Sequence, residues 1–344
     1  MILTNLKFFI RQQISSQEFL SVILHWLIRI VNHKSFFNAK NQSCSHRFPI
    51  YTYDFKPPSY PLYPTDSCID NAMYGIGQTI LSYAGINRHS KCFIEHGVFF
   101  GNHIQFDQKN HWTNKIITMS RTRVEHLLCR NIKRPILPIG PYIMYAPSII
   151  SSPEYTNLKR TLGRTLLVIP SHTSSGFQAI QDESSFIDIV NDLSSGYQSV
   201  IILLYYLDLM NSDRCLAYQK AGFKIFCAGH KYDPSFLSRL RTIIELSDYT
   251  VSNSVGTHVG YCAALGKPHY IINSNAREVA FSSNTSHFRS HYDSCRLSEI
   301  KNVLSVFDEY SDSLTPDQEY IVDKYWGTSM FRKPECIRNF ILGS

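Results

Sequence analysis

The 344-residue chain has no long apolar run. Its most hydrophobic stretch, Phe19 to Val31, contains thirteen residues, whereas a helix that crosses a bilayer needs about 20. A secretory signal is not expected either, because Lys7 and Arg11 interrupt the early apolar residues and no small-residue cleavage site follows. The sequence therefore predicts a chain without a transmembrane helix or an export signal.

The sequence also has few residues at metal-ligand spacing. Its nine cysteines stand singly, without the CxxC or Cys/His spacings of zinc sites, so we expect free thiols in a reducing cytosol. No Asp-x-Asp pair is present, and a Mg²⁺ or Mn²⁺ ion held by clustered carboxylates has no obvious ligands. The sequence predicts a protein without a metal ion or other cofactor.

Three common signatures are missing. The chain has no GxxxxGK[ST] of a P-loop, no GxGxxG between a strand and a helix, and no GxSxG nucleophile elbow. P-loop NTPases, classical dinucleotide folds and α/β-hydrolases are therefore disfavoured. Nucleic-acid binding would depend on charge alone, because no RNA- or DNA-binding motif is present, and we expect no nucleic-acid partner.

The composition is that of a packed protein, since 44% of the residues are hydrophobic and 18% are charged. The length suits two domains, which we place at residues 1–150 and 151–344. The first holds 16 basic and 7 acidic side chains, net +9, and the second holds 18 and 20, net −2. A basic first half fits an anionic membrane surface or an anionic substrate.

The stretch from Phe19 to Val31 is expected to form an amphipathic helix. Ser21, His25 and Arg29 follow one another at intervals of four, which draws a narrow polar stripe along an otherwise apolar helix. Two interpretations stay open. The helix packs into the first domain and exposes only the stripe, or it lies in the plane of an anionic leaflet.

Strands and helices alternate after Asp70. The proline-rich segment 48–64 predicts an irregular ordered loop, and a Ser/Pro-rich join follows at 147–157. On either side of that join, buried strands are separated by helices, which is the pattern of a parallel sheet covered by helices. We predict an α/β fold of two Rossmann-like, doubly wound parallel-sheet domains that face a cleft. The predicted strands are 91–94, 115–119, 136–139, 165–169, 200–206, 224–227, 249–251 and 269–272, and the predicted helices are 72–84, 121–129, 186–193, 234–246 and 258–265.

The segment Ser247 to Ile272, SDYTVSNSVGTHVGYCAALGKPHYII, runs from a strand through a turn rich in hydroxyls into a helix. Free backbone N–H groups and the dipole at a helix N-terminus favour a bound phosphate, and Gly256 allows close approach. An ordinary Ser/Thr helix cap is the plain alternative. The turn residues that we expect to hold the phosphate are Ser252, Asn253, Ser254, Gly256 and Thr257.

This segment resembles the donor-phosphate segment of GT-B glycosyltransferases, particularly the capsule, teichoic and lipopolysaccharide polymer enzymes. Glu95-His96-Gly97, after a first-domain strand, is similar to their "HG" loop. Gly229-His230-Lys231 is similar to their donor-binding "HP" loop, except that Lys231 stands where the family has proline. The resemblance implies a first domain that receives the acceptor and a second that binds a nucleotide-sugar donor.

The resemblance also implies roles for individual residues. His96 is the expected catalytic base, acting as a neutral imidazole, with Glu95 or Asp107 orienting or replacing it. A buried structural histidine is the alternative. The second domain would contribute two further loops to the donor site. The alternatives are that residues 171–175 form a solvent-exposed turn and that Lys231 is an ordinary surface lysine. These donor-binding candidates are Ser171, His172, Thr173, His230 and Lys231.

We therefore expect a cytoplasmic, metal-independent glycosyltransferase of polysaccharide biosynthesis, inverting by the resemblance, at the inner face of the cell membrane. Its partners would be a nucleotide sugar and a surface-polysaccharide or lipid-linked glycan acceptor. A nucleotide-sugar 2-epimerase of the same architecture and a non-catalytic partner in polysaccharide assembly are the alternatives.

Overall fold

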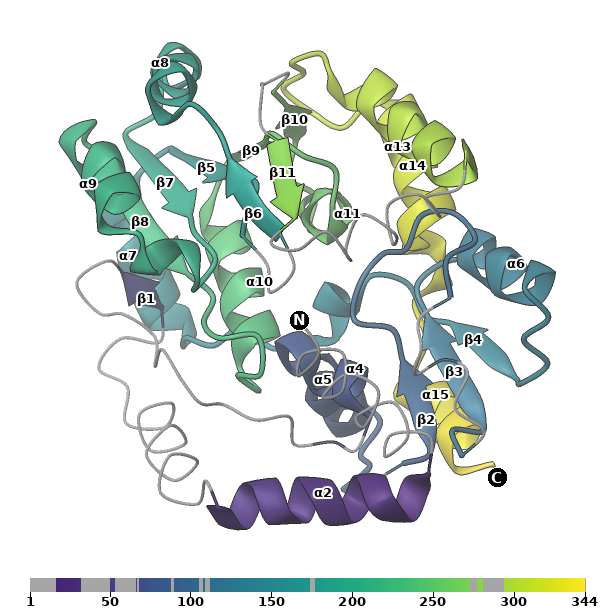
Figure 1. The fold of residues 1–344 in the computed structure, drawn as a ribbon. Helices are drawn as coiled ribbons and strands as arrows, with labels where there is room; N and C mark the ends of the chain where they lie inside the picture. Colours follow the sequence, from purple (N-terminus) through teal and green to yellow (C-terminus); the bar gives the residue numbers. More distant parts are fainter. Residues whose placement is uncertain are drawn as a thin grey trace.

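The computed structural model describes residues 17–31, 50–52, 66, 68–87, 90–104, 108, 112–173, 177–272, 277–280 and 294–343. Within them the chain forms two parallel sheets flanked by helices (Figure 1). This confirms the predicted fold class. The division at residue 150 stays a prediction, because segments from both ends of the chain cross between the sheets.

The first sheet has three parallel strands in the order β2-β3-β4. Its central strand is buried because Ile116 and Ile117 face opposite sides of the sheet, each fully covered. Helix α6 begins at a Ser120 cap, whose hydroxyl accepts a hydrogen bond from the Arg123 amide. The bounds are β2 Cys92–Ile94, β3 Lys115–Thr118, β4 Ile136–Pro138, α4 Ile69–Ala72, α5 Ile76–Tyr83 and α6 Arg121–Cys129.

The second sheet has six strands in the order β1-β8-β7-β5-β9-β10. All neighbours are parallel except β1, which pairs antiparallel with β8. The strand order reverses at β5, so a topological switch point lies between β5 and β9. The bounds are β1 Tyr51–Thr52, β5 Thr165–Ile169, β7 Ser199–Leu203, β8 Lys224–Cys227, β9 Tyr249–Ser252 and β10 His269–Ile271.

Among the elements that pack around the second sheet, helices α7 and α9 and a small sheet were not predicted. Helix α7 begins inside the Ser/Pro-rich join, where a Ser151–Glu154 capping box and Pro153 start it. Strands β6 and β11 form a separate antiparallel pair. The helices here are α7 Ser152–Leu162, α8 Glu183–Leu193, α9 Ser212–Lys220, α10 Phe236–Leu246 and α11 Thr257–Ala264, and the pair is β6 Phe177–Ile180 with β11 Arg277–Ala280.

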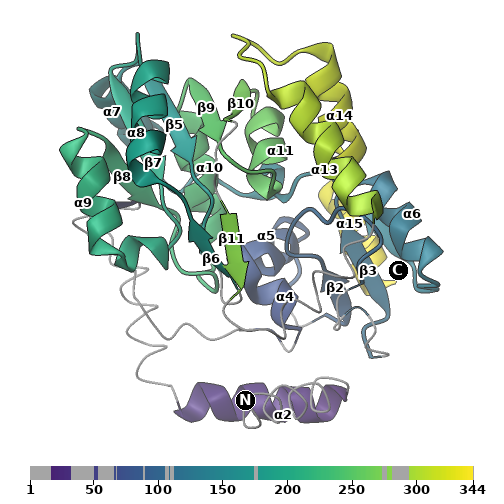
Figure 2. The same cartoon turned by 45° about the horizontal axis from the view of Figure 1, so that its top comes forward.

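Segments distant in sequence join the two halves. The predicted loop 48–64 contributes β1 to the second sheet, and its residues 53–64 lie outside the described part of the chain. The C-terminal tail returns to the first sheet (Figures 1 and 2). There Arg338 Nε donates to the Ala84 carbonyl at 2.8 Å, and Lys115 Nζ donates to the Ile341 carbonyl at 3.2 Å. The tail consists of α13 Ser294–Phe307, α14 Pro316–Trp326 and α15 Pro334–Leu342.

Helix α2, Glu18–Val31, lies along one side of the molecule (Figures 1 and 2). Its N-terminus contacts the first sheet, where the Lys91 ammonium lies 2.7 Å from the Glu18 carboxylate. The alternative in which α2 packs its apolar face into the first domain is wrong, because Phe19 is 74% and Trp26 60% exposed, whereas Ser21 of the polar stripe is 1% exposed. The apolar face is thus the outward one. No helix in the described part of the chain has the length and hydrophobicity to cross a membrane.

Candidate active site between the two sheets

A cavity of about 240 Å³ lies where the carboxyl ends of the strands of both sheets meet. The first half contributes side chains from the loop after β2 and from the start of α5, and the second half contributes the loops after β5, β7, β8 and β9. This is the crevice at which ligands of open parallel sheets bind. Apolar and polar side chains both line the cavity. The polar ones are Tyr74, His96, Ser171, His172, Tyr205, Ser254, Thr257, His258 and Tyr261.

His96 faces this cavity from the first half, directly after β2. Its Nδ1 lies 2.9 Å from an Asp70 carboxylate oxygen in the first turn of α4. Burial lowers the pKa of His96, but the Asp70 charge and hydrogen bond outweigh it, so the pKa is raised. An imidazole that donates from Nδ1 to a carboxylate keeps Nε2 for a substrate proton. Asp70, which the sequence analysis did not name, is therefore the carboxylate that orients this ring.

Glu95, the predicted orienting group, points the other way. It is completely buried and contacts the Arg123 guanidinium at 2.8 Å. Gln108 Nε2 and Thr118 Oγ1 donate short hydrogen bonds to the same carboxylate. With its charge compensated in this way, Glu95 supports the loop that carries His96. Asp107, the other predicted carboxylate, lies outside the described residues.

The two halves touch at the mouth of the cavity. The Val98 amide donates to Thr257 Oγ1 at 3.1 Å, which joins the His96 loop to the first residue of α11. Gly97 is required here for space, because a Cβ at this position would lie 2.6 Å from the Thr257 hydroxyl oxygen. His96 and the turn before α11 therefore line the same cavity, and the neighbouring Val98 contacts Thr257 directly.

The N-terminus of α11 forms the second wall. Ser254, Gly256 and Thr257 line the cavity, and His258 lies beside them. His258 Nε2 lies 3.1 Å from the Ser254 carbonyl, to which it donates when protonated at that nitrogen. Burial lowers the pKa of His258 to about 4, so the ring is neutral near pH 7. A helix N-terminus beside hydroxyls and neutral imidazoles suits an anionic group.

Ser252 and Asn253, predicted as ligands, hold the turn instead. The Ser252 hydroxyl lies 3.0 Å from His269 Nε2 and donates to the Ser254 carbonyl at 3.0 Å. Asn253 Oδ1 accepts from the Ser171 amide at 2.6 Å, and its Nδ2 donates to Gln181 Oε1 at 2.8 Å. Because β5 and β9 are neighbours, Asn253 fixes the loop after one strand to the loop after the other.

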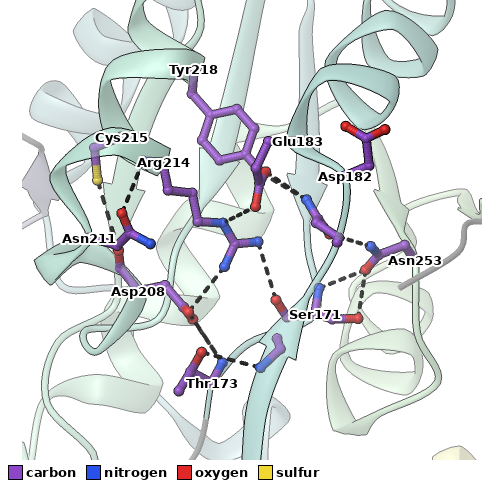
Figure 3. A network of polar contacts seen from close by, with 12 residues as sticks. Ser171, Thr173, Asp182, Glu183, Asp208, Asn211, Arg214, Cys215, Tyr218 and Asn253 are labelled. Atoms are coloured by element: carbon purple, nitrogen blue, oxygen red, sulfur yellow. Dashed lines mark hydrogen bonds and ion pairs between the residues drawn. The ribbon is translucent and has the colours of Figure 1, made fainter. Parts of the chain in front are cut away.

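Figure 3 shows the polar network behind that loop. The Arg214 guanidinium lies 2.8 Å from Glu183 and 3.0 Å from Asp208, and it donates to the Ser171 carbonyl at 3.4 Å. The Asp208 carboxylate also accepts from the Thr173 amide at 3.0 Å. Of the three predicted loop residues, Ser171 and His172 line the cavity, while Thr173 belongs to this network.

His230 and Lys231 are not among the residues that line the cavity. His230 Nδ1 accepts from the Tyr232 amide at 3.1 Å, and its ring packs on Tyr206 with centroids 4.4 Å apart. Burial lowers the pKa of His230 to about 4. The Lys231 carbonyl accepts from the Tyr74 amide at 2.5 Å. This loop thus supports the wall of the site through its backbone.

The sequence did not predict the tyrosines that line the cavity. Tyr74 has a left-handed backbone (φ 57°) at the kink between α4 and α5, and its ring lies 5.0 Å from Phe236. Tyr74 and Tyr205 are hydrogen-bonded side chain to side chain, and burial raises the pKa of both. One feature of the sequence could have indicated Asp70, namely an acidic residue at a helix start upstream of a histidine that needs a partner. No feature of the sequence indicated Tyr74, because its position in the cavity depends on the kink between α4 and α5.

The arrangement combines two chemistries across one gap. A carboxylate-oriented imidazole on the first half can accept or donate a proton. Facing it, amide and hydroxyl donors at a helix N-terminus can stabilise negative charge on a phosphate. The apolar side chains that also line the cavity are suited to the uncharged part of a ligand.

A comparison with known protein families finds no match, and no curated protein sequence matches either. Among solved structures, the chain is similar to S. aureus MnaA with UDP (TM-score 0.36, 9% identity, 76% of this chain and 74% of that one). It is similar to UDP-GlcNAc 2-epimerase from Neisseria meningitidis bound to UDP-GlcNAc, with a TM-score of 0.36 and 10% identity over 78% of each chain. It is also similar to a glycosyltransferase from Rickettsia africae, with a TM-score of 0.32 and 16% identity over 73% of this chain. That match spans 65% of the glycosyltransferase chain, which is under two thirds of its length. Similarity of this degree carries no argument about activity, for which the site's own residues are the evidence.

Proposed function

We propose that the protein is a glycosyltransferase that moves a sugar from a nucleotide-sugar donor to a surface-polysaccharide or lipid-linked glycan acceptor. The observation that carries the proposal is the pairing of His96 with Asp70 on one side of a cavity whose other side is the N-terminus of α11. The donor diphosphate would lie against Ser254, Gly256 and Thr257. The acceptor would enter from the side of the first sheet.

In this proposal His96 is the base. The acceptor hydroxyl oxygen attacks the anomeric carbon while its proton passes to His96 Nε2. The bond from the anomeric carbon to the phosphate oxygen breaks, and the nucleoside diphosphate leaves with the electron pair. The donors of α11 stabilise the charge that develops on that phosphate, so the step needs only this chain's own groups. Attack from the face opposite the phosphate would invert the anomeric centre.

A thermal-shift panel of nucleoside mono- and diphosphates tests the donor site. A ligand that binds only the folded chain stabilises it by about 2.7 kcal/mol at one hundred times its dissociation constant. We expect the best nucleotide to lose most of this shift in Ser254→Ala and Thr257→Ala. It should keep the shift in Thr156→Ala, whose exposed hydroxyl on α7 serves as the matched control. Equal shifts in all three variants would place the donor elsewhere.

Product analysis then tests the reaction. His96→Gln should still bind the nucleotide yet transfer no sugar, because it loses the base and keeps the α11 wall. Incubation with a UDP-N-acetylhexosamine and no acceptor separates transfer from 2-epimerisation, because an epimerase inverts the sugar without an acceptor. Absence of nucleotide binding together with unaltered glycan production in His96→Ala would indicate a non-catalytic assembly partner.

We further propose that α2 rests on an anionic membrane surface and brings the site to a lipid-linked acceptor. Its exposed apolar side chains recur at helical spacing, the net charge of residues 1–150 is +9, and aromatic side chains favour the interface. This outward face is Phe19, Val22, Ile23, Trp26, Leu27 and Ile30.

Flotation with vesicles containing phosphatidylglycerol tests the membrane role. The double variant Phe19→Glu/Trp26→Glu should stay at the bottom of the gradient, while the unaltered chain floats. The control is Met210→Glu/Leu216→Glu, which alters two exposed apolar residues away from α2 and should float as before. If the α2 variant floats as well as this control, the membrane role is lost.

A further inference from the structure

A cluster of three potential metal ligands lies outside the cavity, between α6 and the C-terminal tail. His126 is in the last turn of α6, and Cys295 and Glu299 are one turn apart on α13. One ligand atom from each residue lies within 4.8 Å of the others. His126 Nε2 is 2.9 Å from Glu299 Oε1, and Cys295 Sγ is 3.8 Å from the same oxygen.

The surroundings hold these ligands in place. His126 and Glu299 are each only 8% exposed, and the second Glu299 oxygen accepts a hydrogen bond from the Gly101 amide at 2.6 Å. His126 Nδ1 is buried without a hydrogen-bond partner in the described part of the chain, so the contact with Glu299 leaves this ring incompletely satisfied. A carboxylate with one oxygen fixed by an amide presents the other toward the histidine and the thiol.

The chemistry of the set selects the metal. One imidazole nitrogen, one sulfur and one carboxylate oxygen are the ligand types of Zn²⁺, which a water completes to four. A thiolate and a carboxylate together neutralise a divalent cation, which favours burial of the whole group. We propose that His126, Cys295 and Glu299 bind one Zn²⁺ ion. The Cys295 thiol loses its proton to solvent on binding.

The role assigned to this ion is structural. None of its three ligands lines the cavity, but the Gly101 amide that meets Glu299 belongs to the loop that begins at His96. The same helix α6 supplies Arg123, which donates to the Gly101 carbonyl at 3.0 Å. The ion would therefore fix the tail helix to the loop of the candidate base. This structural zinc site is separate from a catalytic Mg²⁺ or Mn²⁺ site, for which the sequence offers no clustered carboxylates.

Metal content and Co²⁺ spectra of the purified full chain test the proposal. We expect one Zn²⁺ per chain after loading and removal of excess metal, and a higher melting temperature with the ion than after chelation. Co²⁺ should give the near-ultraviolet absorption of a thiolate–metal bond. That band should disappear in Cys295→Ser and persist in Cys129→Ser, which removes an exposed thiol from the end of α6.

Affinity measured by competition with a chromogenic chelator should fall at least about tenfold in Cys295→Ser and Glu299→Gln. Circular dichroism of the metal-free variants checks that they are folded. A substoichiometric metal content in the unaltered chain, or a thiolate band that survives Cys295→Ser, would refute the site. Neither result depends on sugar transfer, so failure here leaves the proposed activity separately testable.

Discussion

At the residue scale, Asp70 decides what His96 can do. The carboxylate lies 2.9 Å from Nδ1, and the net effect of its environment is to raise the pKa of His96. The base form is the neutral ring, so activity should rise with pH as His96 loses its proton. The sequence offered Glu95 and Asp107 as partners, since both are close in sequence, and only the fold brings the more distant Asp70 to the ring.

Replacing this carboxylate gives a test with a defined sign. In Asp70→Asn, His96 loses the neighbouring charge that raises its pKa. The acidic limb of the plot of kcat against pH should therefore move to lower pH. The maximal kcat should fall at least about tenfold, because the ring is less well oriented. The exposed Asp317→Asn change on α14 is the control and should leave the limb in place. An acidic limb that does not move in Asp70→Asn would disconnect Asp70 from the base.

Residue types predicted the location of the site better than the direction of its side chains. Ser171, His172, Ser254, Gly256 and Thr257 follow strands whose carboxyl ends meet, and the parallel topology places them at the cavity. Ser252 and Asn253 come from the same turn and point into the protein. Which hydroxyl faces outward depends on partners such as His269, which no local pattern reveals.

At the element scale, the strands were predictable because their apolar runs are short and bounded by turn residues. Prediction was poorest where tertiary contacts decide the backbone. The helix expected over 72–84 is broken at Tyr74 and Gly75, both with positive φ, and a Cβ at Gly75 would lie 2.3 Å from the Pro234 carbonyl oxygen. The kink that puts Tyr74 in the cavity therefore depends on the other half of the molecule.

The packing of α11 on α14 is a second contact of this kind. Gly260 lies against the fully buried Trp326, and a Cβ there would come within 2.1 Å of the indole. Gly260→Ala should lower the free energy of unfolding by about 1–3 kcal/mol, through overpacking that outweighs the better helix propensity of alanine. Denaturant titration measures the change.

A second variant separates overpacking from other causes. Gly260→Ala/Trp326→Leu should be less destabilised than the sum of its two single variants, because leucine makes room for the added methyl group. Strict additivity would mean that the two residues do not contact each other in solution.

At the scale of the whole molecule, three buried histidines make stability depend on pH. Burial lowers the pKa of His230 and His258 to about 4 and that of His269 well below its ordinary value. An unfolded histidine has a pKa of about 6.5, so below that pH the unfolded chain binds more protons. Stability should therefore fall as the pH falls from about 6.5 to about 4. His96, whose pKa is raised, contributes with the opposite sign.

Melting temperatures measured at intervals across this pH range check the expectation. Each unit of pKa shift corresponds to about 1.4 kcal/mol. Because the pKa of His96 is raised, its opposite contribution falls above about pH 6.5 and does not offset the three histidines within this range. In His258→Gln the decline should be shallower. A flat profile through this range would show that these rings take up protons without unfolding the chain.

The path of the C-terminal tail has a consequence for motion. Two halves joined by one connecting segment can open widely. In this protein three segments connect the halves: the chain around β1, the segment before α7, and α14 with α15. These three connections restrict the halves to a small rocking movement about the cavity. If the proposed function holds, a bulky polymer acceptor would enter the cavity by its end rather than along its length, and a chain terminus would be the group that is extended.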